Sequence, residues 1–295
     1  MSKIDLHLHS KYSADGEFSV KQLLLMCKKQ KMEVISIADH NSVKAVDEAI
    51  RLGNEYGIKV LPGIEIDCVY EGLEFHLLGY GMNHQSAVFA ELENNIYQQE
   101  VINANEKIQK FCSATGFELT KEEVFSKTDN GVVTGELIAE ILLNREDATT
   151  HEILKPYLPG GTKSDMPYVN FYWDFFAQGK VAYTPVNYIS FQEAIEIIHN
   201  NQGIAVLAHP GKNLAGNLNF VDEIIKLGID GIEVFSSYHT KADVDYFYAK
   251  AVSQSLISTC GSDFHGKNKP NIQIGDCNPT IAEDRIIKQV LSRFG

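Results

Sequence analysis

Short apolar runs that alternate with helix-like stretches are the feature that most restricts how this chain of 295 residues can fold. Each run ends in polar residues or glycine, and the stretches between them place apolar residues at helical spacing. The runs occupy residues 3–9, 33–38, 58–66, 75–80, 204–208, 229–235 and 256–261. This alternation is typical of parallel β/α units, and seven strands favour a barrel-like α/β sheet. Neither GxGxxG nor GxxxxGK[ST] occurs, which argues against an open dinucleotide-binding fold.

Residues with short polar side chains stand where several predicted helices begin. Ser19 and Ser42 precede helix-like stretches in the first half of the chain, and Thr134 precedes GELIAEILLN. Thr120 and Thr280 are each followed three positions later by a glutamate, which is the pattern of a capping box. We predict that these five side chains cap the backbone amides of their helices.

The regular alternation stops after residue 82 and resumes near residue 181. The intervening sequence of about 100 residues is longer than any ordinary loop. It contains a long polar stretch over 86–112 with helical spacing, ended by Gly116, and two shorter helix-like stretches. We therefore predict a mainly helical insertion at one end of the barrel, acting as a substrate cap. The predicted boundaries are 1–82 and 181–295 for the barrel and 83–180 for the insertion.

The overall composition excludes several classes of protein. No run approaches the ~20 consecutive apolar residues of a membrane span, and the first residues lack the pattern of a secretion signal. A formal charge of −13, from 26 basic and 39 acidic residues, argues against a broad basic surface for long nucleic acid. We expect a cytoplasmic protein with neither a membrane nor a long nucleic acid as its partner. The composition gives no indication of an oligomeric state.

The cysteines do not indicate a disulfide framework. Their number is odd, they are widely spaced and no CxxC occurs, so a thiolate zinc site is not indicated either. We predict buried or inert thiols at Cys27, Cys68, Cys112, Cys260 and Cys277.

Histidines and carboxylates gather at the ends of the predicted strands. In KIDLHLHS, His7 and His9 are two residues apart on a strand and therefore share one face. One such pair is as compatible with a structural role as with a metal site, so the rest of the chain has to decide. The same residue types recur at other strand ends, where barrel enzymes build their active sites. The full set is His7, His9, Asp15, His40, Glu65, His76, His209, Asp263 and His265.

The chemistry of this set predicts a hydrolytic metal centre. Imidazole and carboxylate ligands without a thiolate suit manganese, iron or zinc. Nine ligands are more than a single four- or six-coordinate ion uses, so we predict more than one ion. A carboxylate such as Glu65 has two oxygens and can bridge two ions, and a hydroxide held by them is a strong nucleophile at neutral pH.

The motifs HLHS with SADG, ADHNS, GIEID, FHLLGYG, AHPG and GSDFHG resemble those of the PHP (polymerase and histidinol phosphatase) family of metal-dependent phosphoesterases. The resemblance covers about residues 1–82 and 181–266. Within that family the insertion is most similar to the stand-alone branch of nucleoside 3',5'-bisphosphate phosphatases and a related 5'-to-3' exoribonuclease. The resemblance implies a distorted seven-stranded (β/α) barrel that is similar to a TIM barrel.

The resemblance also implies three divalent ions, with manganese favoured over iron or zinc. His7, His9, Glu65 and Asp263 would hold the first ion. Glu65 would bridge to a second ion, which His76 and His209 complete. The third ion would be held by Asp15, His40 and His265.

We predict hydrolysis of a small phosphate monoester, such as a nucleoside monophosphate or 3',5'-bisphosphate, by attack of a metal-bound hydroxide on phosphorus. Glu65 and Asp263 are predicted to be indispensable for it. Lys212, in AHPGK, is predicted to contact the substrate phosphate, and a solvated lysine is the alternative. His239, in FSSYHT, is a candidate for substrate contact or proton donation, against the alternative of a surface histidine. Glu233 is interpreted as an acid that supports the ligands.

One departure from the resembling branch concerns substrate choice. That branch usually carries an Arg-Pro-His stretch that meets the substrate phosphate, whereas this chain reads VVTGELIAEIL there. Arg145 lies a turn or more further along its helix, so a bisphosphate nucleotide is not assured as the substrate. Six aromatic residues either stack a base or, as their density favours, pack the insertion against the barrel: Tyr168, Phe171, Tyr172, Trp173, Phe175 and Phe176.

Three other functions share parts of this pattern. A metal-dependent amidohydrolase or deaminase also uses HxH on its first strand, but no lysine ends a middle strand here to bridge two ions. A non-catalytic metal-binding module, like those attached to bacterial polymerases, often lacks ligands that are all present here. An exonuclease acting on short RNA or DNA would share the whole site and would differ only in which substrates the insertion allows to enter it.

Overall fold

The structure is a computed structural model that describes residues 2–128, 130–214 and 218–294. The chain forms two compact units. Unit 1 comprises residues 1–92, 188–265 and 272–295, and unit 2 comprises residues 93–187 and 266–271. The sequence-based boundaries at 82 and 180 differ from these limits, and the role of the insertion as a substrate cap stays a prediction.

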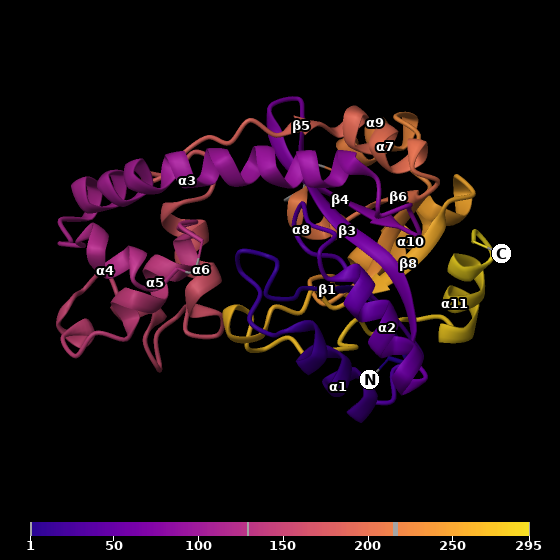
Figure 1. The fold of residues 1–295 in the computed structure, drawn as a ribbon, viewed down its shortest axis with the longest axis horizontal. Coiled ribbons are helices and arrows are strands. Elements are labelled where there is room, and N and C mark those ends of the chain that lie inside the picture. The colour runs from indigo at the N-terminus through magenta and orange to yellow at the C-terminus, as the bar shows by residue number, and fades with distance from the viewer. Residues whose placement is uncertain (1, 129, 215–217, 295) are drawn as a thin grey trace. The chain divides into compact units, whose positions relative to one another are not determined.

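Unit 1 contains all the strands of the described chain (Figure 1). They are β1 (Ile4–Leu8), β2 (Val34–Ile37), β3 (Lys59–Tyr70), β4 (Leu73–Tyr80), β5 (Ile189–Ser190), β6 (Ile204–Leu207), β7 (Gly231–Ser236) and β8 (Ile257–Gly261). Its helices are α1 (Val20–Lys29), α2 (Val46–Tyr56), α7 (Phe191–Asn200), α8 (Pro210–Asn213), α9 (Asn219–Lys226), α10 (Lys241–Ser253) and α11 (Glu283–Leu291). Seven of the strands coincide with the seven predicted runs, and the two-residue strand β5 was not predicted.

Unit 2 is helical, as the sequence predicts for most of its length. It contains most of the long helix α3 (Ala87–Thr115), whose first six residues belong to unit 1. The other elements are α4 (Lys121–Phe125), α5 (Gly135–Leu143), η1 (Ala148–Thr150), η2 (Lys155–Tyr157), α6 (Pro167–Phe175) and η3 (Gly266–Asn268).

The sheet of unit 1 is a nearly closed barrel with the strand order β1-β2-β3-β4-β6-β7-β8, and β5 adds to β3. The amide of His9 donates to the carbonyl of Phe264 at 3.0 Å, and the amide of Asp263 donates to the carbonyl of His7 at 2.8 Å. These bonds join the chain after β8 to the end of β1. Helix α2 packs on β3, α7 on β4 and β6, α10 on β7 and α11 on β8 (Figure 1). The predicted α/β barrel is confirmed.

The sheet is mixed, because the pattern of parallel β/α units breaks at β4. This strand pairs antiparallel with both β3 and β6. Strands β3 and β4 form a hairpin whose two turn residues, Glu71 and Gly72, both have positive φ, at 50° and 77°. Positive φ at both central positions is the geometry of a type I′ turn, whose twist matches that of the strands it joins. The sequence run 75–80 therefore returns directly along β3 instead of following a crossover helix.

Three of the five predicted helix caps are confirmed. The side chain of Ser19 accepts from the amide of Gln22, that of Thr120 from Glu123, and that of Thr134 from Leu137. The other two predictions are wrong. Helix α2 begins four residues after Ser42, whose hydroxyl instead accepts from the amide of Lys44 at 3.3 Å. Helix α11 begins at Glu283 without a side-chain cap, and the carboxylate of Glu283 accepts from the amide of Lys3.

The aromatic run of the insertion forms part of the core of unit 2. Phe171 and Phe176 are buried, and their ring centroids lie 5.5 and 5.4 Å from that of Phe111 on α3. All buried members of this core fall between residues 104 and 182. The aromatic residues were expected to pack against the barrel, whereas these two pack within their own unit. Trp173 is 41% exposed.

None of the helices in the described part of the chain combines the length and apolarity that crossing a bilayer requires.

Candidate metal centre

The nine residues predicted from the strand ends come together in unit 1. His7 lies on β1, Glu65 on β3 and His76 on β4, whereas the other six follow β1, β2, β6 and β8. They fall into three groups in which every ligand atom lies within 4.8 Å of the others. The groups are His7, His9, Glu65 and Asp263; Glu65, His76 and His209; and His9, Asp15, His40 and His265.

Glu65 stands at the centre of this cluster and uses its two oxygens differently. Oε2 lies 3.0 Å from His7 Nε2 and 3.2 Å from His9 Nε2. Oε1 lies 2.9 Å from His76 Nδ1 and 3.1 Å from His209 Nε2. The carboxylate therefore faces two separate pairs of imidazoles.

Backbone bonds fix Glu65 beside the IADHN segment. The amide of Asn41 donates to the carbonyl of Glu65 at 2.7 Å, and the amide of Glu65 donates to the carbonyl of Asp39 at 3.1 Å. Asn41 has a φ of 55°, a conformation that asparagine tolerates better than most residues. These contacts bring His40, which follows β2, alongside the carboxylate.

Two candidate ligands are held in unusual backbone conformations. His209 has a φ of 20° and Asp263 a φ of 58°, although neither is glycine. Positive φ is costly for residues with a Cβ and persists where the surroundings impose it, commonly at functional sites. Each residue lies two positions beyond the carboxyl end of a strand, β6 for His209 and β8 for Asp263. The tight turns aim these side chains back over the barrel end.

Burial and charge set the protonation of the cluster. Burial alone would raise the pKa of Glu65, but the charges of His7, His40 and His76 outweigh it and hold that pKa well below its usual range. Burial and the nearby charge of His265 lower the pKa of His9 to about 4. His9 is therefore neutral at pH 7, the form in which imidazole binds metals.

Residues outside the nine orient them. Glu233 Oε1 lies 3.0 Å from His7 Nδ1, and its Oε2 accepts from the amide of His209 at 2.8 Å. Tyr238 donates from its hydroxyl to Asp263 Oδ2 at 2.7 Å. The other oxygen of Asp263, Oδ1, lies 3.1 Å from His9 Nε2. Bonds of this kind fix the tautomer and direction of metal ligands.

Sequence reasoning missed Asp67. Its Oδ1 lies 2.8 Å from His40 Nδ1, and it forms a fourth cluster with His40 and His76. Asp67 is two residues after Glu65 on β3, so the two carboxylates share a face of the strand. The reasoning that singled out the HxH pair on β1 would have found the ExD pair on β3. Tyr238 and Ser13, whose hydroxyl lies 2.9 Å from His9 Nδ1, carried no comparable sequence signal.

Both ring nitrogens of His239 form hydrogen bonds with backbone groups. Nδ1 donates to the carbonyl of Val234 at 2.8 Å, and Nε2 accepts from the amide of Gly211 at 3.0 Å. Burial lowers its pKa, which favours the neutral ring that this pattern needs. With both nitrogens occupied, the ring ties α8 to β7, and the role of His239 in proton donation or substrate contact stays a prediction. Lys212 is exposed on α8, with Nζ 5.9 Å from the centre of the Tyr238 ring.

Arg145 does not replace the arginine that is absent from the insertion. Its guanidinium binds both carboxylate oxygens of Glu123, at 2.8 and 2.7 Å, and the carbonyl of Glu118 at 3.0 Å. All these groups belong to unit 2. The arginine therefore joins α4 to the end of α5.

The donor set fits divalent metal ions. It combines six imidazoles with carboxylates and contains no thiolate, as the sequence indicated. Within the described part of the chain, the buried His9 Nε2 faces Glu65 Oε2 and Asp263 Oδ1 at 3.2 and 3.1 Å but makes a well-formed hydrogen bond to neither. A buried polar atom of this kind is rare unless an ion or water satisfies it. Nitrogen and oxygen donors together suit manganese, iron or zinc.

Comparison with known proteins agrees with this geometry. The sequence pattern of the family described as PHP domain matches residues 5–203. A phosphoribosyl 1,2-cyclic phosphate 1,2-diphosphodiesterase from Eggerthella lenta is 28% identical over 265 residues, 89% of this chain and 94% of that protein. A 3',5'-nucleoside bisphosphate phosphatase from Chromobacterium violaceum is 25% identical over 279 residues, 93% of this chain and 91% of that protein.

The fold is also similar to a solved structure. A protein from Bifidobacterium adolescentis, provisionally described as a metal-dependent phosphoesterase, superimposes with a TM-score of 0.77 and 23% sequence identity. The match covers 98% of this chain and 96% of that one. At this identity the likeness concerns the fold alone.

Proposed function

The chain belongs to the PHP domain family, and on that premise we propose that its clustered histidines and carboxylates hold divalent metal ions that hydrolyse esters of a small phosphorylated compound. The observation that carries the proposal is the position of Glu65. A fully buried carboxylate faces His7 and His9 with one oxygen, and His76 and His209 with the other. This is the arrangement expected of a ligand that bridges two ions.

We propose three ions, with manganese as the first choice and iron or zinc as alternatives. The three groups of ligand atoms support this number, because each offers enough donors for one ion. His7, His9, Glu65 and Asp263 would hold the first ion, and Glu65, His76 and His209 the second. Asp15, His40 and His265 would hold the third.

The side chains of the centre prepare it for phosphoryl transfer. Divalent ions, once bound, stabilise the charge of the transition state and lower the pKa of water. Glu233 accepts the Nδ1 proton of His7, so that His7 presents the lone pair of Nε2 to the cluster. Tyr238 donates its hydroxyl proton to Asp263 Oδ2 and so fixes the direction of that carboxylate. We propose that Lys212, on the short helix after His209, contacts a phosphate oxygen of the substrate.

The relatives name two kinds of small phosphorylated compound. The Eggerthella protein is named for a phosphoribosyl cyclic phosphate and the Chromobacterium protein for a nucleoside bisphosphate. This chain lacks the arginine expected of the bisphosphate branch, and Arg145 is bound to Glu123. We therefore propose a phosphate ester of a sugar or nucleotide and treat a cyclic phosphate as the second candidate.

The test is a substrate panel with manganese-loaded enzyme. It contains p-nitrophenyl phosphate, a nucleoside 3',5'-bisphosphate, a ribose cyclic phosphate diester, a short oligoribonucleotide and an amide substrate. We expect release of phosphate, or ring opening, from at least one small ester and no hydrolysis of the amide. Release of mononucleotides from the oligoribonucleotide alone would favour the exonuclease. A metal-loaded protein that is inert on all the phosphate esters would contradict the proposal.

Tyr238 offers a test of how the centre is organised. We expect Tyr238→Phe to weaken metal binding roughly tenfold and to reduce kcat by a similar factor, because ligand-orienting partners have effects of about this size. KM should change little, since the hydroxyl bonds to Asp263. Metal affinity is measured by competition with a chelator. Tyr248→Phe is the control, because the ring of Tyr248 lies on α10 against Phe235. An equal effect in both variants would show that Tyr238 does not orient Asp263.

A further inference from the structure

Two of the five cysteines meet inside unit 1, beside the first residue of β1. Cys260 lies on β8 and Cys277 precedes α11, and both are buried. Their sulfurs are 2.9 Å apart. A disulfide bond needs about 2.05 Å, so the two sulfurs would have to approach by roughly 0.9 Å. No sequence motif pairs these two residues, which are 17 positions apart without a CxxC pattern.

The surrounding bonds already hold the two cysteines in place. Both thiols lie beside the carbonyl of Ile4, with Sγ–O distances of 3.2 Å for Cys260 and 3.5 Å for Cys277. The buried Asp5 accepts from the amide of Ser262 at 2.9 Å and from that of Gly275 at 2.7 Å. These amides stand two residues inside each end of the segment between the cysteines. Bringing the sulfurs together therefore requires little movement of the backbone.

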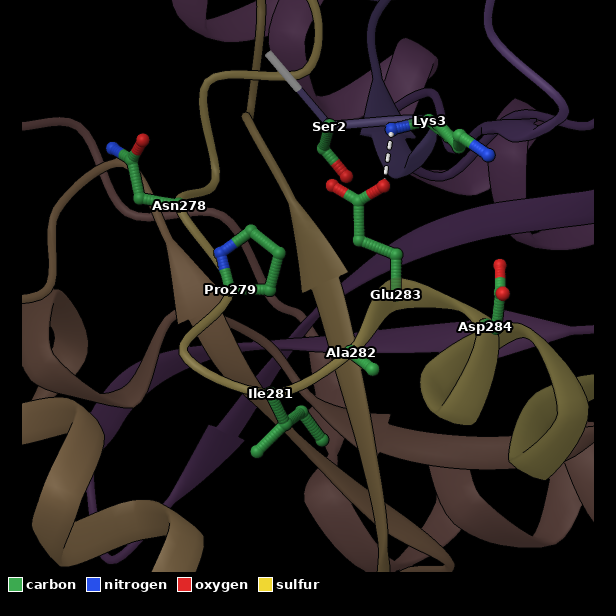
Figure 2. A pocket seen from close by; sticks show the side chains of 8 residues that line it. All are labelled: Ser2, Lys3, Asn278, Pro279, Ile281, Ala282, Glu283 and Asp284. Carbon is green, nitrogen blue, oxygen red and sulfur yellow. Dashed lines mark hydrogen bonds between the residues drawn. The ribbon is translucent and has the colours of Figure 1, made fainter.

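A surface hollow is lined by residues that neighbour this pair. It has a volume of about 550 Å³ and is lined by Ser2, Lys3 and residues 278–284 except Thr280 (Figure 2). The hydroxyl of Ser2 lies 3.8 Å from the sulfur of Cys260. Asn278, another residue of the lining, directly follows Cys277 in the sequence. Two residues of the lining, Ser2 and Asn278, are thus immediate neighbours of the two cysteines, one in space and one in sequence.

We propose that Cys260 and Cys277 form a disulfide on exposure to a peroxide and so close the segment 261–276 into a loop. Hydrogen peroxide accepts two electrons: one thiol attacks an oxygen and becomes a sulfenic acid with loss of water, and the second thiol displaces a second water as the S–S bond forms. Two thiols and one peroxide thus give one disulfide and two waters. The closed loop contains Asp263 and His265.

The chemistry of the pair implies a slow reaction. The neighbouring Cys260 thiol and burial raise the pKa of Cys277 well above its usual value. Because the thiolate is the reactive form, little of it is available at neutral pH. The pair should therefore stay reduced under mild conditions and become oxidised only during prolonged exposure to peroxide.

The test counts free thiols in the full chain. The metal-free protein is incubated with hydrogen peroxide, denatured and alkylated, and its intact mass is compared with that of untreated protein. We expect five alkylated cysteines before oxidation and three afterwards, with a peptide that links Cys260 to Cys277 and disappears on reduction. Five alkylated cysteines after oxidation, a bridge to any other cysteine, or oxidation beyond the disulfide would each overturn the proposal.

Variants separate this pair from the other buried thiols. Cys260→Ser and Cys277→Ser should each abolish the loss of thiols, whereas Cys27→Ser and Cys68→Ser should leave it unchanged. If a serine variant does not fold, the peptide map of the unaltered protein still decides the question. Closing a loop of this length should also raise Tm by roughly 5 °C, and a disulfide that left Tm unchanged would contradict the restraint we ascribe to it.

Discussion

Glu65→Gln is expected to lower turnover by about a thousandfold or more and to reduce the metal content of the purified protein. Glutamine keeps the shape of the side chain but replaces one oxygen with an NH₂ group, which cannot bind a metal ion. Because Oε2 faces His7 and His9 while Oε1 faces His76 and His209, either orientation of the amide deprives one pair of its shared ligand. Phosphate release and elemental analysis measure the two effects.

The matched control for this variant is Glu71→Gln. Glu71 is an exposed glutamate in the turn that joins β3 to β4, the same hairpin that carries Glu65. It should retain full metal content and activity. Circular dichroism of both variants checks that the barrel is folded. Unchanged turnover and metal content in a folded Glu65→Gln protein would mean that the cluster does not hold the catalytic ions.

Gly261→Ala is expected to disturb the metal centre by displacing the strands that carry it, without removing any candidate ligand. A Cβ at this position would stand 2.2 Å from Glu233 Oε1 and 2.3 Å from His7 Cβ. His7 Cβ is next to the backbone of β1 and cannot rotate away, so β8 or β1 has to shift. A displacement of this size can cost about a hundredfold in rate, and the overpacking should cost about 1–3 kcal/mol of stability. We expect metal affinity, activity and Tm all to fall.

Gly231→Ala distinguishes damage to the centre from damage to the sheet. A Cβ at Gly231 would stand 2.4 Å from Cγ1 of Ile257 on the neighbouring strand, so the crowding is similar. Gly231 begins β7, however, whereas Gly261 ends β8 beside the ligands. The Tm of the Gly231→Ala control should fall, but the control should keep its metal ions. Equal loss of metal in both variants would show that the centre responds to general weakening of the barrel.

The parts of this structure that the sequence predicted are those with a local pattern. Alternation of apolar residues located seven strands, and histidines at their ends, such as His7 and His209, identified the cluster. Both signals depend on the spacing of neighbouring residues, which is preserved when the chain folds. The caps at Ser19 and Thr134 were predictable for the same reason.

The features that escaped prediction depend on partners far apart in the chain. The turn at Glu71 and Gly72 reverses the chain, so that β4 pairs antiparallel with β3 and with the distant strand β6. Tyr238 meets Asp263 across 25 positions, and no periodicity links them. The cap predicted at Thr280 failed because Glu283 instead bonds to Lys3 at the other end of the chain. Local spacing cannot report such contacts.

The hairpin of β3 and β4 couples the length of a surface turn to the geometry of the cluster. Asp67 pairs directly with His76, and Glu65 shares the face of Asp67, so the register of this hairpin decides whether His76 faces the centre. The side-chain period of a strand is two, so one extra residue before His76 would direct its ring to the opposite face. An exposed two-residue turn thus acts as a spacer that sets the distance between two of the nine candidate ligands. The length of this turn is therefore constrained, unlike that of most surface loops.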